Sequence, residues 1–225
     1  MFNCEAEMTG PVKRWMESSS LIVKSEFISP WGLCDLVGLS FRKRNVALRL
    51  GLGQRRPLTS MTRAALLLQI PDADTNEFIT MRQIIATCAP ALPKEVVVEE
   101  AQRLMDDKFV IRKGDRLQKV NGWMPLQKRL VAIELKLKRV GEAMLQAQNN
   151  LGFANESYVG LPKALAARMA GSARRDDFCK RGVGLLAVTP VSCEILIRSR
   201  RVSAGNAVFQ FCCVEKFWRT FSKGN

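Results

Sequence analysis

The most regular alternation of apolar and polar side chains lies between Leu130 and Lys138. Four apolar residues alternate there with charged ones: Val131, Ile133, Leu135 and Leu137 with Glu134, Lys136 and Lys138. A repeat of two residues is typical of a half-buried β-strand, so Glu134 and Lys136 share one face, roughly 6.6 Å apart. This spacing suits a metal-binding carboxylate beside a lysine that contacts a phosphate or a water. The simpler interpretation is a solvated ion pair on an amphipathic strand.

The amino-terminal segment predicts a helix followed by a β-hairpin. Residues 5–18 carry an apolar stripe at helical spacing, and residues 21–27 and 33–39 favour strands joined by a turn with Pro30 and Gly32. Asp35 lies on an apolar strand face, where aspartate is uncommon. Because burying an unpaired carboxylate is costly, Asp35 requires a lysine, a hydrogen-bond network or a metal beside it. The alternative is a strand-end aspartate that accepts a nearby backbone N–H.

Residues 59–120 change to helical spacing. Apolar positions predict a helix that ends before Pro71, a second over 81–88 and a third over 96–105, followed by a hairpin around a turn at 113–115. Three helices followed by a two-stranded wing resemble a winged-helix domain. The third helix is acidic and would repel phosphates, so we expect this block to bind a partner or to be structural, with the wing as its phosphate contact.

The carboxyl-terminal part predicts strands and helices in alternation. We expect a helix over 141–150 with Gln146 near its middle, a buried strand over 156–162 and a basic helix over 163–181. A strand over 183–188 and its hairpin partner over 193–197 follow. Strands that alternate with helices around an apolar core indicate an α/β sheet.

The charge of the chain favours a polyanionic partner. The formal net charge is +14, from 35 Lys and Arg against 21 Asp and Glu. Basic residues concentrate at 42–59, 109–139 and 198–225, whereas residues 60–108 carry five basic and eight acidic residues, a net of −3. The basic run at 42–59 either contacts phosphates or forms a solvated linker.

The absence of histidine excludes Ser-His-Asp and Cys-His catalysis, His-Glu-x-x-His zinc proteases and an imidazole general base. The seven cysteines include no Cys-x-x-Cys pair, so we expect buried reduced thiols rather than disulfides or zinc. Residues 1–10 lack the features of a signal peptide, and no apolar run reaches the ~18 residues of a membrane span. We therefore expect a soluble cytoplasmic protein without a membrane partner, whose chemistry uses carboxylates, lysines and oxygen-ligated metals.

Taken in order, the predicted elements on either side of the winged-helix-like block resemble the PD-(D/E)XK, or restriction-endonuclease-like, nuclease superfamily. In that family an aspartate and then an acid-x-lysine lie on adjacent strands. The resemblance covers residues 1–41 and 123 to about 200. It implies an α/β fold, with a restriction-endonuclease-like mixed sheet flanked by helices at residues 1–50 and 123–225. A winged-helix-like domain, three helices plus a β-wing, is inserted at 51–122.

The residues of the family motif match positions of this chain one by one. Asp35 matches the aspartate, Glu134 and Lys136 match the acid-x-lysine, and Gln146 matches the glutamine that follows on a helix in several branches. No proline precedes Asp35, and 99 residues separate it from Glu134. The resemblance implies that Asp35 and Glu134 bind Mg²⁺ or Mn²⁺ while Lys136 positions the attacking water. A further metal ligand would come from Glu26 or from an acid of the first helix: Glu5, Glu7 or Glu17.

The implied function is a metal-dependent nuclease that hydrolyses phosphodiester bonds, with DNA as the expected substrate. Basic residues on both sides of the motif are candidates for nucleic-acid contacts: Arg42, Lys43, Arg44, Arg55, Arg56, Arg112, Lys113, Lys138 and Arg139. The insert is a candidate surface for a protein partner or a homodimer. The alternative is a non-catalytic nucleic-acid-binding or regulatory protein that keeps a degenerate nuclease-like scaffold.

Overall fold

The chain folds into two compact units in the computed structural model, which describes residues 2–121 and 124–221, without the side chains of 219–221. The first unit consists of residues 1–40 and 127–210, and the second of residues 41–126 and 211–225. Within the described ranges, no helix is both long and apolar enough to cross a membrane.

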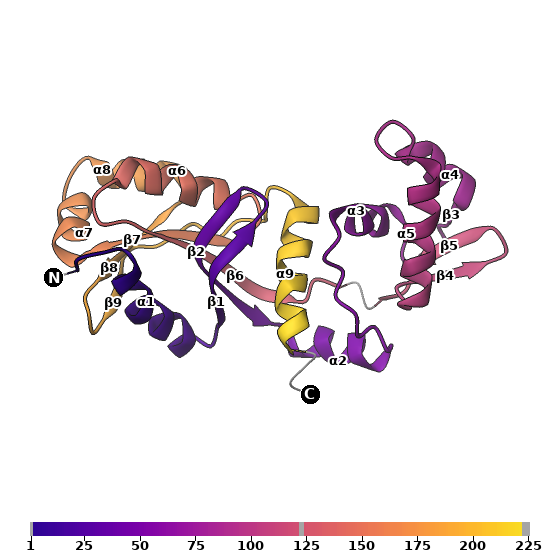
Figure 1. The fold of residues 1–225 in the computed structure, drawn as a ribbon, viewed down its shortest axis with the longest axis horizontal. Helices are drawn as coiled ribbons and strands as arrows, with labels where there is room; N and C mark the ends of the chain where they lie inside the picture. Colours follow the sequence, from indigo (N-terminus) through magenta and orange to yellow (C-terminus); the bar gives the residue numbers. More distant parts are fainter. Residues whose placement is uncertain (1, 122–123, 222–225) are drawn as a thin grey trace. The chain divides into compact units, whose positions relative to one another are not determined.

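A six-stranded mixed sheet forms the centre of the first unit (Figure 1). The strands lie in the order β1 (Ile22–Ser29), β2 (Gly32–Phe41), β6 (Gln127–Leu135), β7 (Glu156–Pro162), β8 (Gly184–Val188) and β9 (Cys193–Ile197). β6, β7 and β8 are parallel, whereas β1 with β2 and β8 with β9 form antiparallel pairs. The predicted α/β sheet is therefore present, and its strands follow the predicted order along the chain. The prediction of a single helix over 163–181 is wrong, because two helices, Lys163–Ala170 and Arg174–Arg181, lie there on either side of Gly171.

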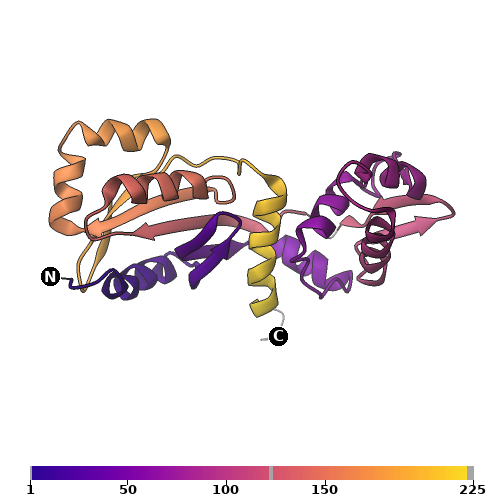
Figure 2. The ribbon, with the colours of Figure 1, turned by 45° about the horizontal axis from the view of Figure 1, so that its top comes forward.

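Helices cover both faces of this sheet (Figures 1 and 2). One face is covered by α1 (Ala6–Ser18), and the other by α6 (Val140–Asn150), α7 (Lys163–Ala170) and α8 (Arg174–Arg181). The parallel strands β6, β7 and β8 follow one another in the same direction across the sheet. Because crossovers between parallel strands are right-handed, their helices are expected on one common face. The opposite face is left for α1, whose Met8, Val12 and Met16 are fully buried against it.

The strand that contains Glu134 is buried on both faces, so the prediction of a half-buried strand is wrong. β6 lies between β2 and β7, and both sheet faces are covered there. Glu134 is only 3% exposed and Lys136 only 8%. The regular strand ends at Leu135, but the Lys136 N–H still donates to the Gly160 carbonyl oxygen at 3.1 Å. A solvated Glu134–Lys136 pair is therefore excluded by burial.

The second unit contains helices and a small sheet around its own core. Its elements are α2 (Lys43–Gly51), α3 (Met61–Gln69), β3 (Ile79–Thr80), α4 (Met81–Cys88), α5 (Lys94–Asp106), β4 (Val110–Lys113) and β5 (Arg116–Lys119), joined by residues 211–221 of α9 (Ala207–Phe221). The antiparallel sheet has the order β3-β5-β4. A capping box between Thr80 and Gln83 begins α4. Apolar residues of α3, α4, α5 and the hairpin share one core, which explains the helical spacing of this block.

The limits of the two units differ from the predicted ranges 1–50, 51–122 and 123–225. Helix α2 and the chain from 211 onward belong to the second unit. The reason is a long-range interaction that no local pattern reveals, since Arg49 of α2 pairs with Glu215 of α9. At the other end of this unit, the Arg42 N–H donates to the Leu126 carbonyl oxygen at 2.7 Å. The two ends of residues 41–126 therefore meet.

Candidate functional site

Asp35 is held at the junction of β2 and β6. Its Oδ2 accepts the backbone N–H of Leu135 at 2.7 Å, directly after Glu134 in the chain. Asp35 accepts a backbone N–H, as the structural interpretation of this residue predicted. It also lies beside the acid-x-lysine strand, as the interpretation as a site residue requires. The 99-residue separation in sequence is closed by the sheet itself, because β2 and β6 are neighbours.

Glu26 lies opposite Asp35, where the pairing of β1 with β2 is interrupted. The register runs through Ser25↔Leu36 and Phe27↔Cys34, with no pair between Glu26 and Asp35. Glu26 has φ 50°, a left-handed conformation that is rare and strained for a non-glycine residue. Strain of this kind is often kept at functional positions, where it aims a side chain.

A cavity of about 350 Å³ opens beside Asp35. Its lining comes from the start of α1, from β1 and β2, and from the end of β6: Glu5, Ala6, Thr9, Ser25, Glu26, Asp35 and Leu135. Three carboxylates therefore face one cavity from three different elements. Of the acids predicted as further ligands, Glu5 and Glu26 are here, whereas Glu7 bonds Asn3 and Glu17 pairs with Lys13.

Glu134 is fixed by an amide from α6. The Asn150 Nδ2 donates to Glu134 Oε1 at 2.7 Å and also contacts Cys34 Sγ at 3.5 Å. Asn150 is 3% exposed, so this bond forms in a dry environment. Sequence reasoning missed Asn150, although it lies one helical turn beyond Gln146 on the same side of α6.

Burial, together with neighbouring carboxylates, raises the pKa of both Glu134 and Asp35. The pKa of Glu134 rises from 4.5 to about 7, mainly because burial disfavours the charged form, with a further increase from the Asp35 charge. The Asn150 hydrogen bond and the Lys136 charge oppose this rise. The pKa of Asp35 is raised by burial and by Glu5 and Glu26, against the Leu135 N–H and Lys136. The site therefore disfavours the charged form of both carboxyl groups, chiefly through burial.

Lys136 is paired with Glu5 at the start of α1. Its Nζ lies 3.2 Å from Glu5 Oε2, and the N–H of Leu137 donates to Glu5 Oε1 at 3.3 Å. Glu5 thus accepts two donors from the segment that follows β6. The ammonium also acts electrostatically on Asp35 and Glu134. Lys136 consequently interacts with the carboxylates of Glu5, Asp35 and Glu134.

Gln146 has a buried amide oxygen, Oε1, without a hydrogen-bond partner. A buried acceptor of this kind is uncommon and requires an explanation. Nothing in the described contacts joins Gln146 to Asp35 or Lys136. Its predicted catalytic role stays a prediction.

The carboxylates fit a magnesium ion that is bound by few protein ligands. In residues 2–121 and 124–221, no three Asp, Glu, Cys or His side chains form a ready-made metal cage. Mg²⁺, however, is usually held by one or two carboxylates together with waters and substrate phosphates. Asp35 and Glu134 would supply hard oxygen donors, and Glu5 and Glu26 line the cavity beside Asp35. These are the residues that would hold the ion.

The predicted nucleic-acid contacts lie on exposed surface, with two of them in ion pairs. Exposed basic residues are Arg42, Lys43, Arg44, Arg55, Arg112, Lys113 and Lys138. Arg56 pairs with Asp107 at 3.3 Å and Arg139 with Glu142 at 2.7 Å. Arg49, which belongs to the same basic run of the sequence, is 1% exposed and cannot reach a phosphate.

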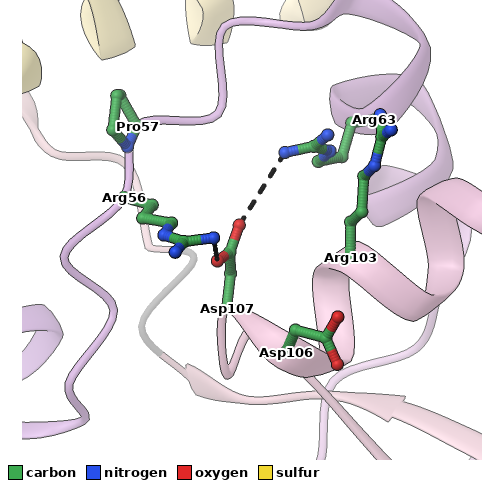
Figure 3. A pocket seen from close by; sticks show the side chains of 6 residues that line it. All are labelled: Arg56, Pro57, Arg63, Arg103, Asp106 and Asp107. Atoms are coloured by element: carbon green, nitrogen blue, oxygen red, sulfur yellow. Dashed lines mark ion pairs between the residues drawn. The ribbon is translucent and has the colours of Figure 1, made fainter.

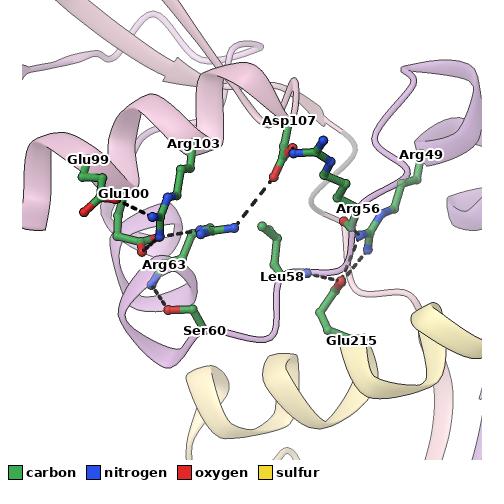
Figure 4. Close-up of polar contacts among 10 residues, drawn as sticks. All are labelled: Arg49, Arg56, Leu58, Ser60, Arg63, Glu99, Glu100, Arg103, Asp107 and Glu215. Carbon is green, nitrogen blue, oxygen red and sulfur yellow. Dashed lines mark hydrogen bonds and ion pairs between the residues drawn. The ribbon is translucent and has the colours of Figure 1, made fainter.

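Arginines also gather at a cavity of about 310 Å³ in the second unit (Figure 3). Arg56 and Arg63 both pair with Asp107, and Arg63 and Arg103 both pair with Glu100 (Figure 4). These carboxylates neutralise the arginines, so the cavity is no anion site. These contacts neutralise Glu100 of α5 and Asp107, the residue that follows the helix, so α5 repels phosphates less than its composition suggests.

Replacing Glu134 by glutamine tests the raised pKa without any ligand. Since the folded state holds the Glu134 proton more tightly than the unfolded chain, raising the pH from 4.5 through about 7 destabilises the wild type. Above about pH 7 this loss in the free energy of unfolding is complete and reaches about 3 kcal/mol. Glu134→Gln keeps the Asn150 bond but does not titrate. We expect its free energy of unfolding to exceed that of the wild type by up to this amount at pH 8 and to match it near pH 4.

Denaturant unfolding in EDTA at the two pH values measures this difference. The matched control is Glu194→Gln, which changes an exposed carboxylate on β9 and should shift stability by less than about 0.5 kcal/mol at either pH. If Glu134→Gln and the wild type differ in free energy of unfolding by the same amount at both pH values, the Glu134 carboxyl does not titrate between them.

Comparison with known proteins assigns no family. No protein-family model matches the chain, and no curated protein matches it at the significance required. Among solved structures, it is similar to the SPO1766 protein of unknown function from Silicibacter pomeroyi. The sequences are 10% identical, the TM-score is 0.47, and the match covers 99% of this chain and 89% of the other. At this level the likeness carries no functional argument, so function has to be argued from the site's own residues.

Proposed function

We propose that the protein is a metal-dependent phosphodiesterase that cleaves nucleic acid, with DNA as the substrate, built on a restriction-endonuclease-like sheet. The observation that carries the proposal is the convergence of Asp35, Glu134 and Lys136 at the junction of β2 and β6. These residues come from segments 99 positions apart; the charges of Asp35 and Lys136 act on Glu134, and the charge of Lys136 acts on Asp35. A solvated surface pair would not require such an arrangement.

Asp35 and Glu134 would hold Mg²⁺ or Mn²⁺ through their oxygens. A bound divalent ion supplies Lewis acidity, which acidifies a water and neutralises charge on the phosphate. The pKa of Glu134 is raised mainly by burial and further by the Asp35 charge, so a bound cation would stabilise the charged carboxylate that these effects disfavour. Asn150 orients the Glu134 carboxylate by its hydrogen bond.

Lys136 would position the attacking water and stabilise charge on the phosphate oxygens. Its present partner is Glu5, whose carboxylate is 37% exposed, and an ion pair of this kind is readily exchanged. A phosphate that enters the cavity competes with Glu5 for the ammonium. Glu5 therefore holds Lys136 in place while no substrate is bound.

The second unit would contribute nucleic-acid binding. Helices α3, α4 and α5 and the sheet β3-β5-β4 resemble a winged-helix domain in the order of their elements, and the hairpin of β4 and β5 carries exposed Arg112, Lys113 and Arg116. Non-specific contacts from such side chains to phosphates fit the net charge of +14.

A non-catalytic nucleic-acid-binding protein is the second candidate, and specific observations favour it. Glu134 is bound to Asn150, Lys136 is bound to Glu5, and no three-carboxylate cage exists among the described residues. On this view the site residues are structural remnants that stabilise the sheet. The two candidates differ in one measurable property, metal-dependent cleavage.

Incubation of the full-length protein with plasmid and with single-stranded DNA tests the proposal. We expect cleavage in Mg²⁺ or Mn²⁺, none in EDTA, and a rate that rises between pH 6 and pH 8 because protons compete with the ion at Glu134. Cleavage that persists in EDTA would contradict the metal site. DNA that is bound but left intact in both metals would overturn the nuclease proposal and leave the non-catalytic one.

A further inference from the structure

A cavity of about 500 Å³ lies beside the hairpin of β4 and β5 in the second unit. Its lining comes from the loop before β3 and from the two hairpin strands: Ala73, Thr75, Asn76, Phe78, Lys113, Arg116 and Gln118. The volume falls within the range of about 300–1,000 Å³ that is typical of small-ligand sites. None of these described lining residues is acidic, although the unit as a whole is rich in carboxylates.

The loop that lines the cavity is held in a defined position. The Gln118 Nε2 donates to the carbonyl oxygens of Thr75 and Glu77, at 3.3 and 2.8 Å. The Thr75 hydroxyl donates to the Asp72 carbonyl oxygen at 2.8 Å. These bonds fix the loop against β5, so the residues that face the cavity are preorganised.

Phe78 and Arg116 stack on each other at this cavity. The Arg116 guanidinium carbon lies 3.9 Å from the centroid of the Phe78 ring, which is contact distance for a stacked pair. Phe78 is 41% exposed, although a large apolar side chain at a loop end gains nothing from water. Aromatic rings and guanidinium planes are both surfaces on which nucleobases stack, so a base can extend this exposed Phe78–Arg116 stack.

Lys113 completes the site with a charge that is free for a ligand. It is exposed, and no ion pair or side-chain hydrogen bond engages its ammonium in the described structure. It lies directly opposite Arg116 in the pairing of β4 with β5. A phosphate linked to a stacked base would therefore find a cation beside the stacking surface.

We infer that this cavity binds one unpaired nucleotide of a single-stranded nucleic acid, with the base stacked on the Phe78–Arg116 pair and the phosphate at Lys113. An acidic peptide would use the two cations but would gain nothing from an exposed aromatic ring. A duplex keeps its bases stacked on each other and would offer only phosphates. The inference rests on the proposed action on nucleic acid and specifies its substrate as one with an unpaired segment.

Fluorescence anisotropy with the full-length protein in EDTA tests this inference without relying on cleavage. The probes are a labelled single strand, the duplex of equal length, and a strand of equal length whose central nucleotides are abasic. We expect Phe78→Ala to weaken binding of the intact single strand about tenfold, and Arg116→Lys, which keeps the charge, to weaken it severalfold. Binding of the duplex and of the abasic strand should change less than twofold.

Lys113→Ala has a matched control in Lys94→Ala, an exposed lysine on α5 of the same unit. We expect Lys113→Ala to weaken the binding of all three probes. Any effect of Lys94→Ala on binding should be the same for the three probes. Equal loss for intact and abasic strands in Phe78→Ala would overturn base stacking. A labelled polyglutamate that binds as tightly as the single strand, with no effect of Phe78→Ala, would assign the cavity to acidic peptides. If the protein shows base stacking but no cleavage, only the nuclease proposal is refuted. If it shows cleavage but no base stacking, only the inference about this cavity is refuted.

Discussion

Glu134→Gln and Lys136→Ala are each expected to lower metal-dependent cleavage of DNA by at least about 100-fold. Glutamine keeps the Asn150 hydrogen bond but removes the charge that would hold the ion, so the loss is chemical rather than structural. Alanine at 136 removes the ammonium that would contact the phosphate and the water. Initial rates of plasmid nicking in Mg²⁺ and in Mn²⁺ measure both effects.

The exposed pair Lys163–Glu194 in the same sheet unit provides matched controls. Its atoms lie 3.0 Å apart at the surface, and Lys163→Ala and Glu194→Gln remove the same groups away from the site. Both should cleave at the rate of the wild type. If Glu134→Gln retains its activity while remaining folded, the proposed site is wrong, whatever cleaves the DNA.

Glu215→Gln is expected to destabilise the second unit by about 3–5 kcal/mol. Arg49 and Glu215 are 1% and 0% exposed, and the carboxylate also accepts the Leu58 N–H at 2.8 Å (Figure 4). The guanidinium further donates to the carbonyl oxygens of Gln54 and Arg56 and lies 4.2 Å from the Trp218 ring centroid. Glutamine leaves this buried cation without its counter-charge, in a position from which it cannot reach water.

Urea unfolding monitored by tryptophan fluorescence measures the loss, because Trp218 stacks on Arg49. The control is Asp177→Asn, which breaks the exposed pair with Arg174 on α8 and should cost less than about 1 kcal/mol. A loss for Glu215→Gln as small as that of the control would mean that water reaches Arg49, in conflict with its burial.

Local patterns in the sequence predicted most elements of both units, although not α9, because most boundaries have local causes. Pro71, Pro90 and Pro93 separate the helices, the Pro30-Trp31-Gly32 turn sets the hairpin, and alternation marks β6. The proximity of Asp35 to the strand of Glu134 was expected only from the order of elements in a resembling family. The structure places them on neighbouring strands, but their function stays a prediction.

The features that the sequence did not predict depend on long-range contacts. Burial of β6 on both faces requires α1 on one side and α6 on the other, and periodicity reports only that polar and apolar residues alternate. Arg49 was grouped with exposed arginines because its partner, Glu215, is 166 residues away. Asn150 was missed for the same reason, since its significance comes from Glu134 on a different element.

The contact between Arg42 and Leu126 has a consequence for how the chain can reach its native state. Asp35 and Leu135 are 100 positions apart, and closing a flexible loop of that length opposes folding by about 4 kcal/mol of chain entropy. If residues 41–126 form their own core first, the Arg42–Leu126 hydrogen bond already brings the two ends of the loop together. β2 and β6 are then joined by what is in effect a short connection. Early folding of the second unit would thus speed the pairing of β2 with β6 in the sheet that holds the site. A variant whose second unit is destabilised should therefore assemble β2 with β6 more slowly.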